Sequence, residues 1–165
     1  MTRRPLPQRR RTRGWRTWLP TALLLALALL LIPHGAQAQC TVSVTTLNYG
    51  TYIPFRAFPT NSTGGVTVDC TAALPAGYTV TLSSGNSGSY SSRRMLYGGY
   101  NLNYQLFTDS LRSNIWGDGS GSTRTVVGDC LSPCHTVHPI YGSMPAGQIV
   151  QPGAYSDTIT VTVIY

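Results

Sequence analysis

Metal-ligating residue types come together in one stretch of the sequence, CLSPCHTVH at positions 130–138. Two cysteines and two histidines can hold zinc in a tetrahedral site. In an exported chain, a pair of cysteines this close together is more often a short disulfide loop, because an oxidising compartment converts thiols to disulfides. We therefore expect a disulfide hairpin kinked by Pro133, with His135 and His138 at the start of a strand, and neither a metal nor another cofactor.

Nucleophilic catalysis would need a serine, a histidine and an aspartate in one arrangement. Three histidines are available, His34, His135 and His138, but the Gly-x-Ser-x-Gly elbow of hydrolases does not occur in the sequence. Because no motif assigns catalytic roles to these residues, we expect a protein that is not an enzyme.

The first 38 residues predict the compartment. A basic head at 1–18 is followed by an apolar segment at 19–32 and by an A-x-A site that ends at Ala38, which is the order found in secretory signal peptides. The apolar segment is shorter than the roughly 20 residues of a membrane-spanning helix. An uncleaved anchor and a twin-arginine leader fit less well. We predict a leader at 1–38, a mature domain at 39–165, and no stable membrane span after cleavage.

Charge argues against a nucleic-acid partner. The chain has 12 basic and 5 acidic residues and a net charge of +7, but most of its arginines belong to the predicted leader. The five acidic residues, all Asp, balance the arginines that remain: Arg56, Arg93, Arg94, Arg112 and Arg124. Binding to phosphates needs a clustered positive surface, and the mature domain has no such cluster beyond the adjacent pair.

All four cysteines follow the predicted cleavage site, at Cys40, Cys70, Cys130 and Cys134. An even number in an exported chain indicates disulfides. Three pairings are possible, and spacing and strand phase favour Cys40 with Cys70 and Cys130 with Cys134, because the first two fall on the apolar phase of their strands. A bridge between Cys40 and Cys70 would contribute roughly 3–4 kcal/mol by the chain-entropy model.

Short alternating segments separated by glycine-rich and serine-rich turns predict an all-β domain, a sandwich or a barrel. Apolar residues alternate with polar ones at 78–82 and at 102–106. The strongest strand signal covers 156–165, where Ile159, Val161, Val163 and Tyr165 share one face and threonines share the other.

Seven segments then point to a known family. They are Cys40, NYGTY at 48–52, VTVDC at 66–70, LNYQLF at 102–107, WGDG at 116–119, YG at 141–142 and PGAYSD at 152–157. In this order they resemble the spore coat protein U domain, which is shared with Csu-type pilins of the archaic chaperone-usher pathway. The resemblance covers nearly all of the mature chain.

This resemblance implies an immunoglobulin-like β-sandwich that is incomplete, because its last strand is supplied by the next subunit. It implies as partners a periplasmic chaperone, an outer-membrane usher and other pilus subunits, and transit through the periplasm to the cell surface. Strand addition to an exposed edge explains such an assembly, and an uncapped edge would otherwise aggregate. By resemblance, the contacts with the chaperone or the donor strand fall to Thr158, Ile159, Val161, Val163 and Tyr165.

The sequence departs from shaft pilins in one respect. Shaft pilins carry a donor segment before the first cysteine, and here only Gln39 precedes Cys40 after cleavage. The hypothesis is a subunit that accepts a strand and donates none, as at the tip or terminus of a fibre, with adhesion or biofilm formation as the role that the resemblance implies.

The alternative function is a free secreted module of the same fold that binds a carbohydrate or a surface. Exposed tyrosines and arginines are favoured at interfaces. The candidate residues for such contacts are Tyr90, Arg93, Arg94, Tyr97 and Tyr100. The alternative for these side chains is that they pack over the sandwich or line turns.

Overall fold

The computed structural model describes residues 40–165, which form antiparallel sheets, so the all-β prediction is confirmed. One sheet has the order β1 (Cys40–Thr45), β2 (Thr60–Cys70), β8 (Cys134–Met144), β6 (Gln105–Phe107). A second has the order β7 (Val126–Cys130), β3 (Leu74–Leu82), β9 (Val161–Ile164), and β4 (Arg94–Tyr97) pairs with β5 (Tyr100–Asn103). A single turn, η1 (Gly85–Ser87), follows β3. The predicted leader and its cleavage site lie outside the described residues.

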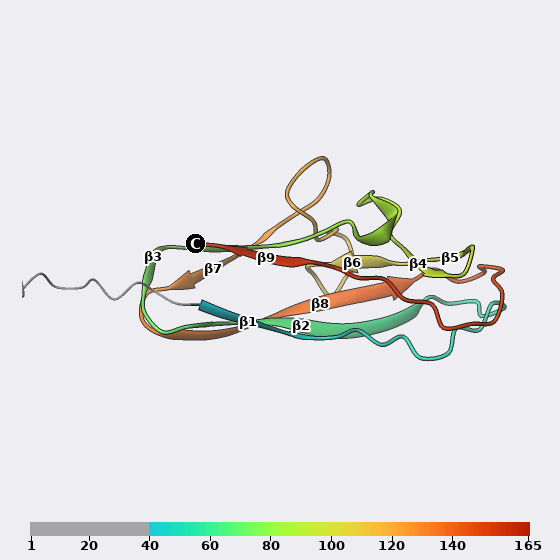
Figure 1. Cartoon of the computed structure of the whole chain (residues 1–165), viewed down its shortest axis with the longest axis horizontal. Coiled ribbons are helices and arrows are strands. Elements are labelled where there is room, and N and C mark those ends of the chain that lie inside the picture. Colours follow the sequence, from blue (N-terminus) through green and yellow to red (C-terminus); the bar gives the residue numbers. More distant parts are fainter. Residues whose placement is uncertain (1–39) are drawn as a thin grey trace, which may run out of the picture. The chain divides into compact units, whose positions relative to one another are not determined.

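The first two sheets lie in two layers (Figure 1). Alternate residues of each strand point into the space between the layers, as the two-residue period of a strand dictates. Val66 and Val68 of β2 face Val80 and Leu82 of β3 across this space, and all four are buried. Trp116 closes the core, with its indole nitrogen donating to the backbone oxygen of Val80. Within residues 40–165, no helix is long and apolar enough to cross a membrane.

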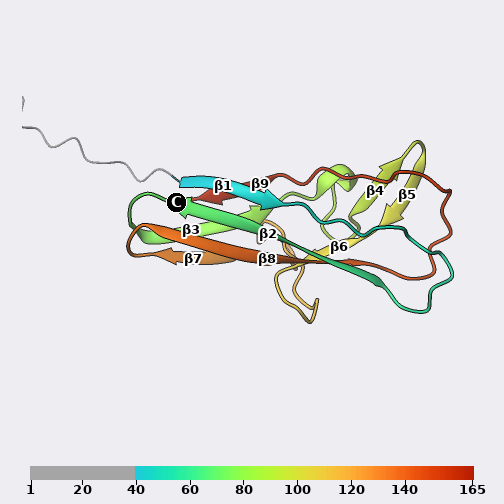
Figure 2. The same cartoon turned by 90° about the horizontal axis from the view of Figure 1, so that it is seen from below.

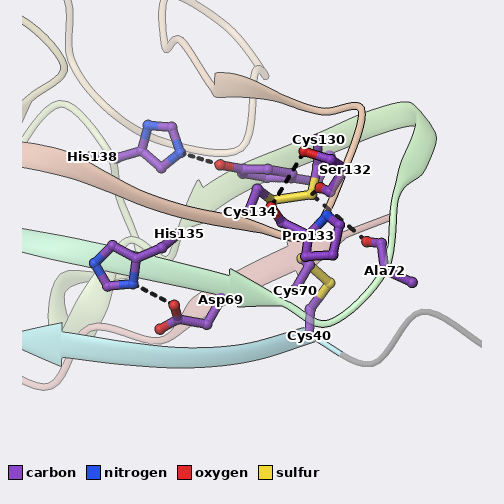
Figure 3. Close-up of a disulfide and its surroundings, with 11 residues drawn as sticks. Cys40, Asp69, Cys70, Ala72, Cys130, Ser132, Pro133, Cys134, His135 and His138 are labelled. Carbon is purple, nitrogen blue, oxygen red and sulfur yellow. Dashed lines mark hydrogen bonds and ion pairs between the residues drawn. A yellow bond between two sulfur atoms is a disulfide. The ribbon is translucent and has the colours of Figure 1, made fainter.

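Two disulfides join the strands at one end of the domain (Figure 3). Cys40 and Cys70 lie directly opposite each other on β1 and β2, with their Cα atoms 4.1 Å apart. Cys130 and Cys134 close the hairpin between β7 and β8. These are the pairs that spacing and strand phase favour.

Arg93 is completely buried, and this contradicts one of the predicted surface contacts. The side chain of Arg93 is 0% exposed. Its guanidinium donates to the backbone oxygens of Ser83 and Trp116 at 2.7 Å and to Oε1 of Gln105 at 2.8 Å. Arg93 therefore joins three segments of the core and has no surface left for a ligand, so its assignment as a surface-binding residue is wrong.

The histidine in the middle of β8 predicts a dependence of stability on pH. Nε2 of His138 lies 2.8 Å from the hydroxyl of Tyr78, and burial lowers the pKa of His138 from its ordinary value of 6.5. The unfolded chain therefore binds a proton more readily than the folded domain, so protonation favours unfolding. We expect the free energy of unfolding to fall as the pH drops below about 6.5, as measured by urea denaturation at pH 7.5 and pH 5.5.

Two glutamine variants provide the comparison. His138→Gln should lose this part of the pH dependence, whereas His135→Gln should retain it, because His135 lies on the exposed face of the same strand and pairs with Asp69. An equal pH dependence in the wild-type protein and in His138→Gln would contradict the assignment.

Candidate functional site

The two sheets leave one long edge of the sandwich open. β1 is the outermost strand of one sheet and β9 is the outermost strand of the other, and among residues 40–165 no strand lies between them. Figure 2 shows both strands along the same edge, where β1 begins and β9 ends at the same end of the domain. Each strand therefore presents backbone N–H and C=O groups that its own sheet does not use.

The core side chains of β1 are only half covered. Val42 and Val44 lie directly opposite Val68 and Val66 of β2, so each pair shares one face of the sheet. The two β2 valines are 0% exposed, whereas Val42 and Val44 are 42% and 46% exposed. The core-facing side of this sheet is thus covered at β2 but partly exposed at the neighbouring edge strand, β1.

The same change in burial occurs in the other sheet. Val161 and Val163 of β9 lie opposite Leu82 and Val80 of β3. The β3 residues are buried, but the two β9 valines are only partly buried. The inner faces of both sheets therefore lose their cover along the same edge, as expected of a sandwich that lacks one strand.

Between the two edge strands lies an apolar groove, which we call the edge groove. It encloses about 260 Å³. Leu82, Leu106 and Ile140 of the core line it together with Val44 from one edge and Val161 from the other. An apolar groove between two unpaired strand edges has the features that bind an extended chain by β-strand addition.

The edge groove continues into a second hollow toward the loops. This hollow encloses about 590 Å³ and lies between residues 46–54 and residues 150–155. Leu47, Tyr49 and Tyr155 line both spaces. The two walls thus extend past the ends of β1 and β9 and offer room for a segment longer than the strands themselves.

Two tyrosines place hydroxyl groups in the mainly apolar groove. The hydroxyl of Tyr104 donates to Oδ2 of Asp157 at 2.6 Å, whereas the buried hydroxyl of Tyr49 has no partner within residues 40–165. Burial raises the pKa of both tyrosines, and Asp157 raises that of Tyr104 further, so both stay neutral. The hydroxyl of Tyr49 lies against Gly142. A Cβ at position 142 would be only 2.2 Å from this hydroxyl, so glycine leaves the space that Tyr49 occupies.

The predicted contact residues of the last strand are only partly in the groove. Ile159 and Val161 line it, and Val163 packs against the core. Thr158 and Tyr165 are exposed. The strand is also shorter than the predicted 156–165.

The segment before β9 is held by β4 and by the carboxylate of Asp157. Ser156 exchanges two backbone hydrogen bonds with Leu96 of β4. Oδ1 of Asp157 accepts from the backbone nitrogens of Asn86 and Thr158, and Oδ2 accepts from Tyr104. These bonds hold the segment before β9 to the loop after β3. Regular pairing therefore begins only at Val161.

The other candidate contact residues are separated by the structure. Tyr97 and Tyr100 are opposite each other at the tip of the β4–β5 hairpin and are about half exposed. The guanidinium of Arg93 lies over the ring of Tyr90, with its central carbon 5.2 Å from the ring centroid of Tyr90. Arg94 is half buried, and its Nε has no partner among the described residues. The two hairpin tyrosines are thus the candidates that share a surface.

The cysteine and histidine cluster is also divided. His135 turns to Asp69 on the neighbouring strand (Figure 3), and His138 turns to the hydroxyl of Tyr78. The sulfurs of Cys70, Cys130 and Cys134 lie within 4.8 Å of one another, and all three belong to disulfides. The four side chains of the 130–138 stretch therefore do not converge on one point.

The donor-strand contact residues predicted from the sequence all belong to the C-terminal wall of the groove. The opposite wall, with Val42, Val44 and Tyr49, was not predicted as a contact site. The alternation of apolar residues from Cys40 to Val44 was a visible signal, but it indicated a core-facing strand like any other. Only the arrangement of the sheets reveals that these core positions remain exposed.

Comparisons with known proteins agree with this geometry. The model of the Spore Coat Protein U domain family matches residues 26–162. "Protein U" of Myxococcus xanthus is 30% identical over 131 residues, which are 73% of this chain and 72% of that protein.

Two solved structures are similar. One is the CsuC–CsuE chaperone–tip adhesion subunit pre-assembly complex of the archaic chaperone-usher Csu pili of Acinetobacter baumannii, with 22% identity and a TM-score of 0.51. The match covers 78% of this chain and 40% of that chain, so this chain spans less than half of its length. The other is HdaB, the minor tip subunit of the E. coli Hda pilus, with 14% identity, a TM-score of 0.40 and coverage of 74% and 79%. The likeness to the Csu structure supports the immunoglobulin-like sandwich.

Proposed function

This chain belongs to the Spore Coat Protein U domain family, and from this membership we propose that it is an exported structural subunit of a chaperone-usher type pilus or surface coat. The observation that carries the proposal is the edge groove, where valines of β1 and β9 are partly exposed while their neighbours on β2 and β3 are buried. A strand from another subunit completes the sandwich there.

The physical basis of the assembly is burial along the groove. An added strand pairs with the free edges of β1 and β9, and its alternate side chains cover Val42, Val44, Val161 and Val163. Each of these side chains contributes on the order of 1 kcal/mol when its exposed half is buried. Each new backbone hydrogen bond adds about 0.5–1.5 kcal/mol. Before assembly, a periplasmic chaperone covers the same edge, and an outer-membrane usher passes the subunit to the cell surface.

We further propose a terminal position in the fibre. This rests on the predicted cleavage after Ala38, which would leave Gln39 alone before β1 and so provide no donor strand. Such a subunit accepts a strand and passes none on, which suits the tip of a fibre and a role in adhesion or biofilm formation.

Co-expression with a candidate chaperone of the pathway tests the proposal, with copurification as the readout. The wild-type chain should form a soluble complex. Val161→Asp puts an unpaired charge in the groove and should reduce recovery of the complex at least tenfold, because burying a lone charge costs several kcal/mol.

The matched control is Val127→Asp. Val127 is an exposed valine on β7, at the opposite edge of the same sheet as β9, and its replacement should leave the complex intact. A wild-type chain that is a stable, soluble monomer without any partner would contradict the proposal and favour a free secreted module that binds a carbohydrate or a surface.

A further inference from the structure

Exposed apolar side chains gather at the end of the domain that lies away from the disulfides. Phe55 and Phe58, in the loop between β1 and β2, are 90% and 79% exposed, and Ile149, between β8 and β9, is 88% exposed. Tyr97 and Tyr100 at the tip of the β4–β5 hairpin are about half exposed. In both views these three segments lie at the same end (Figures 1 and 2). We call these five residues the apolar end.

The loops of the apolar end are tied to one another. The hydroxyl of Tyr52 donates to the backbone oxygen of Pro145 at 3.0 Å and accepts from the backbone nitrogen of Gln148 at 2.7 Å. The side chain of Gln148 in turn accepts from the backbone nitrogen of Asn103 at 2.7 Å. The three segments therefore form one fixed surface, and exposed apolar surface of this kind marks an interaction site.

The groove leads directly to this surface. Along one wall the chain runs from Val44 through Leu47 to Tyr52, and along the other it runs from Val161 back to Tyr155 and Pro152. The hollow beyond the strands is thus bounded by the same loops that carry the apolar end. A chain that extends out of the groove on this side therefore passes next to the apolar end.

β1 and β9 run in opposite directions (Figure 2), so a strand between them is antiparallel to one and parallel to the other. For this inference we adopt antiparallel pairing with β9, since antiparallel pairing is the more stable form per residue. The strand then enters beside the Cys40–Cys70 disulfide and leaves at the apolar end. Because each further residue spans at most about 3.5 Å, the folded body that follows a short linker lies against this end.

We propose that the apolar end is the docking surface for the folded body of the subunit whose strand fills the edge groove. This inference rests on the proposed function. The partner surface is apolar, with an acidic group for Arg56, the exposed charge between Phe55 and Phe58. The patch therefore adds a second contact, body to body, to the one made by the strand.

Photo-crosslinking in the producing cell tests both contacts separately. A benzophenone side chain is introduced into the full chain at position 44 in the groove, at position 55 in the apolar end, or at position 131, an exposed leucine near the disulfides. We expect positions 44 and 55 to capture the same subunit and position 131 to capture none. Capture at 44 without capture at 55, or capture at 131 in place of 55, would overturn the docking inference and leave the proposed function intact.

No capture of a subunit at position 44 would instead remove the proposed function, and the inference with it. Capture of polysaccharide or lipid at position 55 would overturn the inference in favour of a surface contact.

As a second measurement, Phe55→Ser with Phe58→Ser should lower incorporation into the fibre about tenfold, as the loss of two apolar contacts predicts, while capture at position 44 persists. Unchanged incorporation would also overturn the inference. Leu131→Ser is the matched control.

Discussion

Replacing Cys40 and Cys70 together by alanine is expected to lower the free energy of unfolding by about 3–4 kcal/mol. The bridge closes a loop with a sequence separation of 30, and a long closed loop restricts the unfolded chain more than a short one. Urea denaturation of the oxidised wild-type protein and the double variant measures the difference. Both cysteines are replaced because Cys70, left as a free thiol, would lie close to the second disulfide.

The Cys130–Cys134 bridge provides the control. Its sequence separation is only 4, and the same model gives a contribution of about 2 kcal/mol. The variant Cys130→Ala with Cys134→Ala should therefore lose clearly less stability. Equal losses would contradict the loop-entropy explanation and would point to local packing around the sulfurs.

A loss of about 3–5 kcal/mol is expected for Arg93→Met. Methionine fills much of the same space, but it cannot donate to the oxygens of Ser83, Trp116 and Gln105 that the guanidinium satisfies. Buried acceptors without a partner lose their full solvation. Urea denaturation is again the measurement, and the expected result is a lower midpoint with an unchanged slope.

Arg124→Met tests whether the effect depends on burial. Arg124 is exposed, and its replacement should change the free energy of unfolding by no more than about 0.5 kcal/mol. If both variants unfolded alike, water would have to satisfy the core acceptors in place of Arg93, and the structural role given to Arg93 would be wrong.

The fold could be predicted where a strand shows its own period. Val66, Val68 and Cys70 alternate with polar residues, and so do Tyr78, Val80 and Leu82, because each of these strands covers a core on one face and solvent or a neighbour on the other. These are strands β2 and β3 in the structure. The beginning of the last strand was not predictable in the same way, since it depends on Asp157 and its partners in a distant loop.

The burial of Arg93 and the presence of the groove could not be predicted from local sequence patterns, because both depend on contacts between distant parts of the chain. Arg93 stands in a serine-rich segment that reads as a surface loop, and its burial depends on Ser83, Gln105 and Trp116 from other parts of the chain. The exposure of Val42 and Val44 depends on what lies beside β1, and no strand within residues 40–165 pairs with its outer edge. Local sequence indicates which face of a strand is apolar, but not whether another strand covers it.

The position of the first disulfide has a mechanical consequence. In the proposed fibre, a strand held lengthwise between β1 and β9 would carry tension along its own axis, so its hydrogen bonds would be loaded together in shear and would not open one after another. The weak points would then be the two walls of the groove, because β1 and β9 are each hydrogen-bonded to their own sheet on one side only. The covalent link from Cys40 to Cys70 fixes β1 to β2 at its first residue, so a pull along the groove would not peel β1 away from β2 at that end.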